Sequence, residues 1–403
     1  MIKPQHLSKI PLTLLAFCAL TAISMPAQTL TTLVHFNNSN GGQPESSLVQ
    51  GPDGNFYGTA SVGGTNGGGT VFKMAPAGKL TVLYSFCSLT DCNDGDEPGQ
   101  LLLASDRNAY GFTVMGGANC HQLTGSGCGT IFKLTPQKTL VTLYSFCVQT
   151  NCTDGWNPDS LIQASDGNFY GTTFHGGPNG AGEVFRITPG GVLTVLYGFT
   201  NGQQPENLMQ ASDGNFYGTT YGCGIVFQLT PDGIVTTLHT FSANEGCTTH
   251  SGLIQASDGN FYGTTQEGGA PHSNGTVYRL TISGTLTRLF SFACNQGNCP
   301  DGEDPVAALV QGSDGNLYGS TRGVFAGGLT NDGTIFQITT AGQLTTLHQF
   351  AYSDGAFPIA ALMQAANGDF YGTTYLGGLA KCDRQSCGTV FSLSVGIGPS
   401  RKP

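Results

Sequence analysis

A four-segment unit repeats along this chain, and the segment missing from its last copy stands at the opposite end of the sequence. Residues 30–36 read LTTLVHF and match the fourth segment of the unit. The seventh copy, near the C-terminus, stops after its third segment. A closed ring needs this arrangement, because pairing the first strand with the last copy leaves no unpaired sheet edge. An open stack of repeats would gain nothing from it.

The most regular part of each copy reads L-x-Q-A/G-x-D-G-N-F-Y-G-T-T, and two copies are degraded. The six intervals between positions 53 and 367 average about 52 residues, close to the ~40–50 residues of a propeller blade. Aspartate or asparagine with glycine favours a hairpin between the first two segments, because glycine adopts a positive φ without steric cost. The turn positions are Asp53, Asp106, Asp166, Asp213, Asp258, Asp314 and Asn367.

Each copy holds four strand-like segments, predicted in the third copy at 161–165, 168–173, 183–188 and 193–199. Turns at Pro189 and Pro231 join the third segment to the fourth. We therefore predict an all-β fold, a seven-bladed β-propeller of four-stranded antiparallel blades closed by the N-terminal strand. A β-solenoid, the main alternative, would require capping turns and no such permutation. The fourth segment ends on phenylalanine in every occurrence, at Phe36, Phe86, Phe146, Phe199, Phe241, Phe292 and Phe350.

The domain organisation follows from these copies. Residues 1–27 combine two lysines, an apolar run and a small-residue end, which is typical of a secretory signal peptide cleaved after Ala27. Phe17 stands where a lipoprotein signal ending at Cys18 would need a small residue. We expect the propeller to span 28–396 and a tail to span 397–403. The repeats lie near 43–86, 98–146, 158–199, 205–241, 250–292, 305–350 and 358–394, with 30–36 completing the last.

Composition narrows the classes of partner. Charged residues are 10% of the chain and 61 of 403 residues are glycine, which excludes a disordered polyelectrolyte and long helices. Without residues 1–27, thirteen basic residues stand against 25 acidic ones, a net charge of −12. A protein with this negative net charge is not expected to bind nucleic acid or anionic membranes. No later stretch approaches the ~20 apolar residues of a membrane helix. We expect a monomer that is secreted or resides in the periplasm or cell envelope and does not span a membrane.

The D-G-N-F-Y-G-T-T block, together with the later G-T-V-F, resembles the Gloeo/Verruco-specific tandem repeat (GloVer) of bacterial exported proteins. The resemblance covers nearly the whole chain after residue 27. It implies no established activity and no catalytic residues, so no role passes to a named position. Family members carry varied surface anchors, whereas this sequence shows no sorting tail between 396 and 403.

The loops between copies predict which face of the propeller binds. Loops joining the second segment to the third, and one blade to the next, vary strongly and emerge on one face, which we call the loop face. Twelve cysteines lie beyond residue 27, an even number typical of a disulfide set in an exported protein. Zinc is the alternative, but scattered pairs on separate blades do not favour it. The predicted bridges are Cys87–Cys92, Cys120–Cys128, Cys147–Cys152, Cys223–Cys247, Cys294–Cys299 and Cys382–Cys387, all on the loop face.

Candidate ligand-binding residues fall into three groups. Trp156 is the single tryptophan and suits stacking on sugars or side chains, or else covers a loop. The loop-face histidines could converge in space, although none shows metal-ligand spacing. Six copies have a glutamine at one position of the first segment, and the remaining copy has Leu103. Each glutamine points either toward the channel or to the backbone of a neighbouring blade. The candidates are Trp156, His121, His175, His250, His272, Gln163, Gln210 and Gln255.

Catalytic and metal signatures are weak. The sequence contains no G-x-S-x-G, phosphate loop or H-E-x-x-H motif, so we predict no catalytic residues, no cofactor and no dedicated metal site. Two acidic clusters offer hard oxygen donors for calcium, but neither has the full spacing of an EF-type loop, so the sequence favours a solvated acidic loop. We therefore expect a binding or interaction scaffold for a glycan or protein, and the alternative is a secreted carbohydrate-active hydrolase or lyase at the channel mouth. The weak calcium candidates are Asp91, Asp94, Asp96, Asp301 and Asp304.

Overall fold

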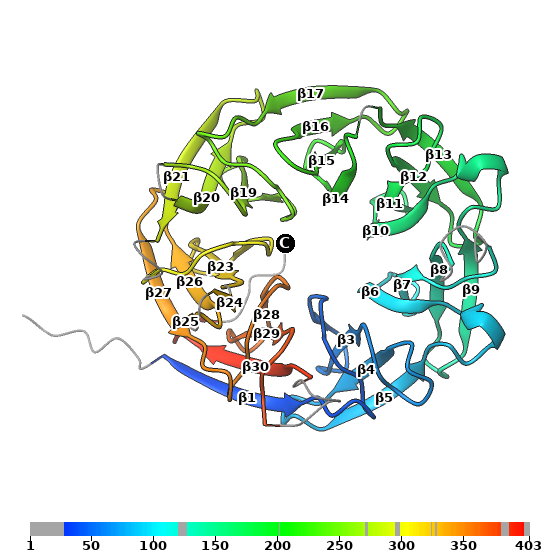
Figure 1. Ribbon diagram of the computed structural model, residues 1–403, viewed down its shortest axis with the longest axis horizontal. Coiled ribbons are helices and arrows are strands. Elements are labelled where there is room, and N and C mark those ends of the chain that lie inside the picture. Colours follow the sequence, from blue (N-terminus) through cyan, green and yellow to red (C-terminus); the bar gives the residue numbers. More distant parts are fainter. Residues whose placement is uncertain are drawn as a thin grey trace, which may run out of the picture.

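The computed structural model is a ring of seven four-stranded antiparallel sheets around a central channel (Figure 1). Apart from two short 3₁₀ turns, Thr90–Cys92 and Thr150–Cys152, the described residues form strands, turns and loops. None of them belongs to a helix long and apolar enough to cross a membrane. The structure describes residues 28–119, 127–200, 202–270, 273–294, 299–323, 325–326, 329–379 and 387–398. The predicted signal peptide lies outside this part of the chain.

In blades 1 to 6 the strands follow the chain from the channel outward, so the first strand of each blade is innermost. Blade 1 contains β2 (Val49–Gln50), β3 (Phe56–Ala60), β4 (Thr70–Met74) and β5 (Leu80–Ser85). Blade 2 contains β6 (Asp96–Leu103), β7 (Ala109–Met115), β8 (Thr130–Leu134) and β9 (Leu140–Ser145). Blade 3 contains β10 (Trp156–Gln163), β11 (Phe169–His175), β12 (Glu183–Ile187) and β13 (Leu193–Gly198).

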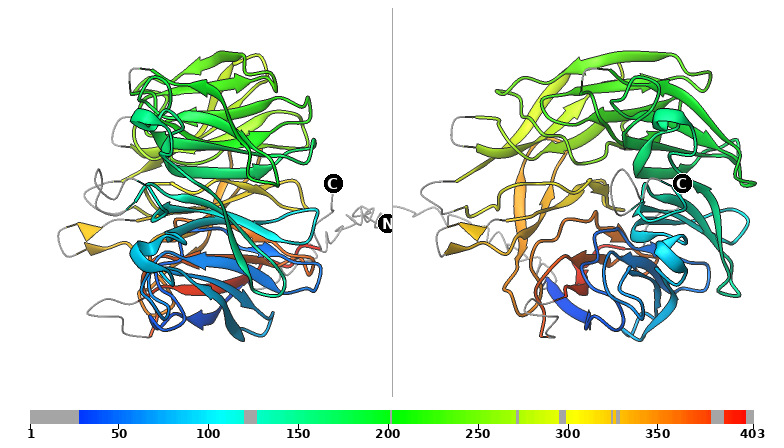
Figure 2. Two further views of the ribbon diagram at one scale, coloured as in Figure 1. Left: turned by 90° about the vertical axis from the view of Figure 1, so that its right-hand side faces the viewer. Right: turned by 45° about the vertical axis from the view of Figure 1, so that its right-hand side comes forward.

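Blades 4 to 6 repeat the pattern. Blade 4 contains β14 (Pro205–Gln210), β15 (Phe216–Thr220), β16 (Ile225–Leu229) and β17 (Val235–Thr240). Blade 5 contains β18 (Ile254–Gln255), β19 (Phe261–Thr265), β20 (Ser273–Leu280) and β21 (Leu286–Ala293). Blade 6 contains β22 (Val310–Gln311), β23 (Leu317–Thr321), β26 (Thr334–Ile338) and β27 (Leu344–Gln349), and between its second and third strands a small hairpin of β24 (Phe325–Ala326) and β25 (Leu329–Thr330) projects from the loop face (Figure 2).

Blade 7 confirms the predicted closure of the ring. It consists of β28 (Met363–Gln364), β29 (Phe370–Thr374), β30 (Thr389–Ser394) and, as its outer strand, β1 (Thr29–His35). Leu30 pairs with Leu393 and Val34 with Val390 in the antiparallel register. The N-terminal strand is therefore the fourth strand of the last blade, and it pairs with the edge of β30 that would otherwise be open.

The strands of blade 3 begin and end differently from the prediction. The first strand was predicted at 161–165, but β10 starts at Trp156 and ends at Gln163. Its early start depends on a register shift between Pro158 and Ser160, which lets Trp156 pair with His175. Residues 164–165 belong instead to the hairpin turn, where the Ala164 N–H donates to Asn168 O at 2.9 Å.

The core lies between the blades and is built from the repeated motif. The second strands are buried along most of their length, and in β15 every residue is buried. The glycine in each second strand leaves room for a ring from the third strand. In β11, for example, a Cβ at Gly171 would stand 2.6 Å from the ring of Phe185 and would collide with the Ser160 carbonyl. At five blade boundaries the motif tyrosine stacks on the motif phenylalanine of the next blade, as Tyr170 does on Phe216 at 4.2 Å between ring centres.

Candidate functional site

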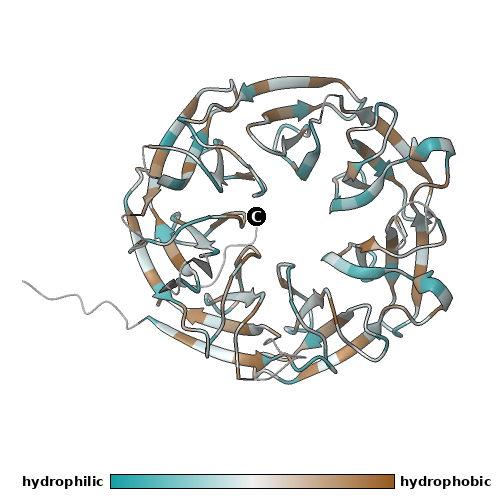
Figure 3. Cartoon of the chain, viewed as in Figure 1, coloured by the Kyte–Doolittle hydropathy of each residue, from teal (hydrophilic) through white to brown (hydrophobic). Residues whose placement is uncertain are grey.

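One position per blade faces the central channel at its inner edge. It follows the proline at the start of each first segment, or Thr249 in blade 5, and we call these seven residues the channel ring. The channel holds a cavity of about 350 Å³, which six ring members line. Glu206, the seventh, is only 4% exposed. Figure 3 colours the inner strands β6, β10 and β14 largely as hydrophilic. The channel ring consists of Glu45, Gly99, Asp159, Glu206, His250, Val306 and Ile359.

Three ionisable members of the ring stand on consecutive blades. His250 Nδ1 lies 3.0 Å from Glu206 Oε1. The backbone N–H of Asn207 donates to Asp159 Oδ2 at 3.2 Å, and its side-chain amide donates to the His250 carbonyl at 2.8 Å. Asn207 therefore connects the three blades through hydrogen bonds. Glu206 Oε2 is buried and has no hydrogen-bond partner within the described part of the protein.

The surroundings of this group shift its protonation equilibria. Burial, and then the negative charge of Glu206, raise the pKa of Asp159 to about 6. The hydrogen bond with Glu206 raises the pKa of His250, and it outweighs the opposing effect of burial. The site therefore combines an imidazole whose protonated form is stabilised with an aspartate that exchanges its proton close to neutral pH.

We call Asp159, Glu206 and His250 the acidic group. An arc of aromatic rings extends from it across the loop side of blades 3 to 5. Trp156 stacks on His175, with ring centres 4.3 Å apart. Phe174 packs against Tyr221 with ring centres 5.7 Å apart, and Tyr221 packs against His250 with ring centres 5.3 Å apart. Tyr221 is 44% exposed. These five rings, which we call the aromatic arc, form a partly exposed surface that ends beside the acidic group.

The structure brings together three of the predicted ligand-binding residues, Trp156, His175 and His250, within this arc. Two further candidates, His121 and His272, lie outside the described residues. Sequence reasoning missed Asp159, Glu206, Asn207, Phe174 and Tyr221. The signal that could have found the acids is their place in the repeat. Aligning six copies on the proline of the first segment, and the fifth on Thr249, puts all seven ring residues in one column.

The repeated glutamines bond between blades. Gln163 Oε1 accepts from the backbone N–H of Ser105 in the preceding blade at 3.0 Å, and its Nε2 donates to Gly167 O of its own turn. Gln210 and Gln255 do the same with Ser165 and Ser212. This amide latch recurs at six blade boundaries and is the structural alternative that the sequence left open. A direct role of Gln163, Gln210 and Gln255 in binding a ligand stays a prediction.

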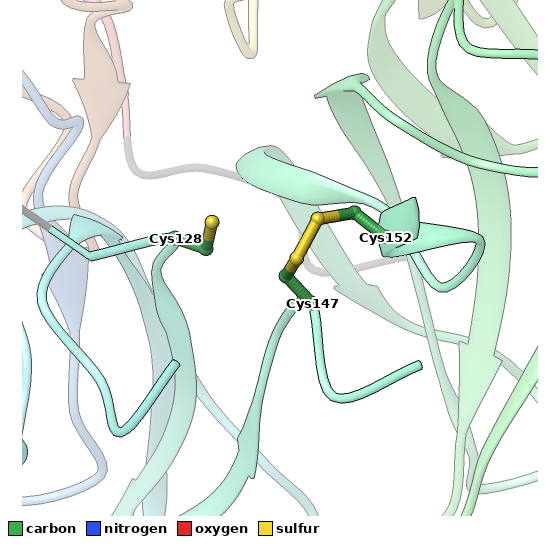
Figure 4. A group of neighbouring side chains, drawn as sticks. All are labelled: Cys128, Cys147 and Cys152. Atoms are coloured by element: carbon green, nitrogen blue, oxygen red, sulfur yellow. A yellow bond between two sulfur atoms is a disulfide. The ribbon is translucent and has the colours of Figure 1, made fainter. Parts of the chain in front are cut away.

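Four predicted disulfides are present on the loop face: Cys87–Cys92, Cys147–Cys152, Cys223–Cys247 and Cys294–Cys299. The other two pairs include Cys120 and Cys382, which lie outside the described residues. Cys128 stands beside the Cys147–Cys152 bridge (Figure 4), and the three sulfur atoms lie within 4.8 Å of one another. Disulfides in this number are typical of extracellular or periplasmic proteins.

The acidic loop residues mainly organise their own loops. Asp94 is 1% exposed, and its carboxylate accepts hydrogen bonds from Tyr84 and from the backbone N–H groups of Ser88 and Leu89. Asp304 forms an ion pair with Arg322 at 2.8 Å. Calcium binding by Asp91, Asp94, Asp96, Asp301 and Asp304 stays a prediction.

Comparisons with solved structures agree with the fold. Virginiamycin B lyase from Staphylococcus aureus superposes with a TM-score of 0.60 at 13% identity, over 91% of this chain and 99% of that one. A catalytically inactive variant of that lyase with quinupristin gives a TM-score of 0.59 at 14% identity, with the same coverage. A streptogramin B lyase gives 0.61 at 14% identity, over 91% of this chain and 97% of that one. At these identities the likeness concerns the fold alone.

The sequence itself identifies the family. No curated protein matches the chain. The model of the Gloeobacter/Verrucomicrobia repeat matches residues 20–124, 121–300 and 204–399, which together span almost the whole propeller. The repeats that build the seven blades therefore place this chain in the Gloeobacter/Verrucomicrobia repeat family.

Proposed function

We propose that this protein is an exported binding scaffold that recognises a glycan at the mouth of its channel on the loop face. The observation that carries the proposal is the continuity of the aromatic arc with the acidic group of the channel ring. Aromatic rings with one apolar face stack on the C–H faces of sugars, and carboxylates accept hydrogen bonds from hydroxyl groups. Trp156 and Tyr221 supply the rings, and Asp159, which lines the channel cavity, supplies a carboxylate.

The rest of the loop face suits a binding role. Short disulfide-closed loops, such as Cys87–Cys92 and Cys147–Cys152, hold the rim in place before a ligand arrives. A preformed rim lowers the entropic cost of binding. The propeller supplies a rigid base, and the loops that differ between blades supply the shape.

Replacing Trp156 with alanine is expected to weaken glycan binding about tenfold, because an aromatic stacking contact contributes about 0.5–1.5 kcal/mol beyond burial. A glycan array followed by calorimetry on the best ligand measures this. Trp156→Phe should retain most of the affinity. Tyr352→Ala, which removes an exposed aromatic ring on another blade, should leave it unchanged. Equal affinity of Trp156→Ala and the unaltered chain would contradict the proposed site.

The Glu206–His250 pair favours a second candidate function, a carbohydrate hydrolase or lyase at the same mouth. An imidazole 3.0 Å from a carboxylate, beside an aspartate with a pKa of about 6, is an arrangement that can donate and accept protons near neutral pH. This candidate predicts turnover of an oligosaccharide by the purified chain.

If turnover is found, Glu206→Gln should reduce it by at least about a hundredfold, the usual contribution of a positioned acid or base. Release of reducing ends or of unsaturated products reports the reaction. Glu267→Gln, which alters an exposed loop-face acid, is the matched control. Binding without turnover by the unaltered chain would leave the scaffold as the function and exclude the enzyme for the glycans tested.

A further inference from the structure

The boundary between blades 1 and 2 lacks the amide latch that joins the other blades. The acceptor position of blade 2 is Leu103 instead of glutamine. The donor position of blade 1 is Pro52, which has no backbone N–H to offer. Both ends of the hydrogen bond are therefore missing together, and no buried polar group is left without its partner.

The aromatic stack is missing at the same boundary. Blade 2 has Ala109 where other blades have phenylalanine or, in blade 6, Leu317. Among the described residues, no aromatic ring consequently stacks on Tyr57 of blade 1, which is only half-buried. The six equivalent tyrosines are at most 4% exposed, namely Tyr110, Tyr170, Tyr217, Tyr262, Tyr318 and Tyr371.

These replacements open a cavity of about 1110 Å³ on the short-turn face, opposite the loop face. We call it the seam cavity. Its apolar wall includes the rings or chains of Tyr57, Leu83, Leu103, Ala109 and Leu134. This size and lining match a site for a small organic ligand.

Two cations at the rim stand where the other blades have glycine. Arg107 replaces the glycine of the first hairpin turn, and Lys138 replaces that of the second. Their φ angles are 70° and 67°, in the left-handed region that disfavours residues with a Cβ. The chain therefore tolerates strained backbone at two turns of one blade, and in both cases the residue gained is basic and lines the seam cavity.

The charges of this rim are not internally balanced. Lys73 pairs with Asp53 at 2.6 Å, so the one carboxylate that lines the cavity among the described residues is already neutralised. Although burial opposes the shift, hydrogen bonds from Lys73, Asn55 and Tyr57 hold the pKa of Asp53 below its usual range. Within the described part of the chain, Arg107 and Lys138 form no ion pair. A free positive rim is unusual in a chain whose net charge is −10.

We propose that the seam cavity binds an amphipathic organic anion. Its apolar body lies against Tyr57, Leu103 and the space left by Ala109, and its carboxylate or phosphate head contacts Arg107 and Lys138. Guanidinium and ammonium groups form charge-assisted hydrogen bonds with such heads, and the apolar wall rejects small hydrated anions. This site is separate from the aromatic arc, so it does not depend on the function proposed above.

The experiment uses the purified chain and 8-anilinonaphthalene-1-sulfonate, a fluorescent probe with an apolar body and an anionic head. Saturable binding at one site is expected, with displacement by dodecanoate and by dodecyl phosphate but not by dodecanol or inorganic phosphate. The relative potency of dodecanoate and dodecyl phosphate identifies the preferred head. Displacement by inorganic phosphate alone at similar concentrations would overturn the requirement for an apolar body.

The variant Arg107→Gly/Lys138→Gly restores the residues of the other blades, and it should weaken probe binding at least tenfold. Its thermal midpoint should equal or exceed that of the unaltered chain, which separates lost binding from lost folding. Ala109→Phe, which refills the space beside Tyr57, should weaken binding to a similar extent. Lys79→Ala, an exposed lysine near a blade 1 turn, and Trp156→Ala on the loop face are the controls. Unchanged probe affinity in the double glycine variant would overturn the proposal.

Discussion

Replacing Phe36 with alanine is expected to lower the free energy of unfolding by about 3–5 kcal/mol, the usual cost of deleting a fully buried ring. Phe36 is 0% exposed and directly follows β1, the strand that closes the ring. Its ring contacts Phe72 of blade 1 edge-to-face at 5.4 Å, and its backbone N–H donates to Gly388 O at 3.1 Å. The residue thus fastens blade 7 to blade 1.

Chemical denaturation measures this effect. Thr31→Ala, on the exposed side of β1, is the matched control and should change stability by less than about 0.5 kcal/mol. A loss as small for Phe36→Ala as for Thr31→Ala would mean that closure of the ring contributes little to stability.

The second large effect is expected from Glu183→Thr, which should raise the free energy of unfolding by about 3 kcal/mol at pH 7. Glu183 is 0% exposed, and both its carboxyl oxygens lack a hydrogen-bond partner in the described structure. Burial, followed by the charge of Asp154, raises the pKa of Glu183 to about 9, from an ordinary value of 4.5. The folded chain therefore keeps a proton that the unfolded chain releases.

The sign of the pH dependence follows. Between about pH 4.5 and pH 9 the unfolded state binds fewer protons at this site, so stability falls by about 1.4 kcal/mol per pH unit as pH rises. Five other blades have threonine at this position, and in blade 2 Thr130 bonds the facing Thr113 at 2.9 Å. The threonine introduced by Glu183→Thr would face Thr173 in the same register.

The measurement is denaturation of both proteins at several pH values. The advantage of Glu183→Thr should be small at pH 4 and should grow toward pH 8.5. Thr130→Ser, a mild change at the equivalent position of blade 2, should leave the pH slope as it is in the unaltered chain. The same pH slope in Glu183→Thr and the unaltered chain would show that Glu183 ionises inside the fold at little cost.

The fold could be predicted from the sequence because its information is local and repeated. The Asp-Gly-Asn turn occurs in each copy in recognisable form, and the displaced segment 30–36 carries the same final phenylalanine as the others. What failed was the start of β10, because the register shift after Pro158 depends on tertiary pairing with β11. A period-two pattern cannot show where such a shift falls.

The candidate site could be predicted only in part. Trp156 and the histidines stand out in the sequence as rare residue types, whereas Glu206 and Asp159 resemble ordinary surface acids. They become candidate site residues only because the closed ring brings equivalent positions of consecutive copies together at the channel. Leu103 is recognisable in the sequence as an exception. Its relation to Pro52 is visible only in the structure, where Leu103 occupies the acceptor position and Pro52 the donor position of the missing hydrogen bond between blades 1 and 2.

The pairing of β1 with β30 ties the two ends of the chain into one cooperative unit. During synthesis, β1 is made first, but its partner strand is made only with the last copy. This strand pairing joins residues at opposite ends of the described chain, so it is expected to form slowly. Damage to the seventh copy consequently differs from shortening a solenoid, whose stability declines one repeat at a time. Loss of that copy would leave β1 without its partner strand and expose the buried apolar faces of blades 1 and 6 at once.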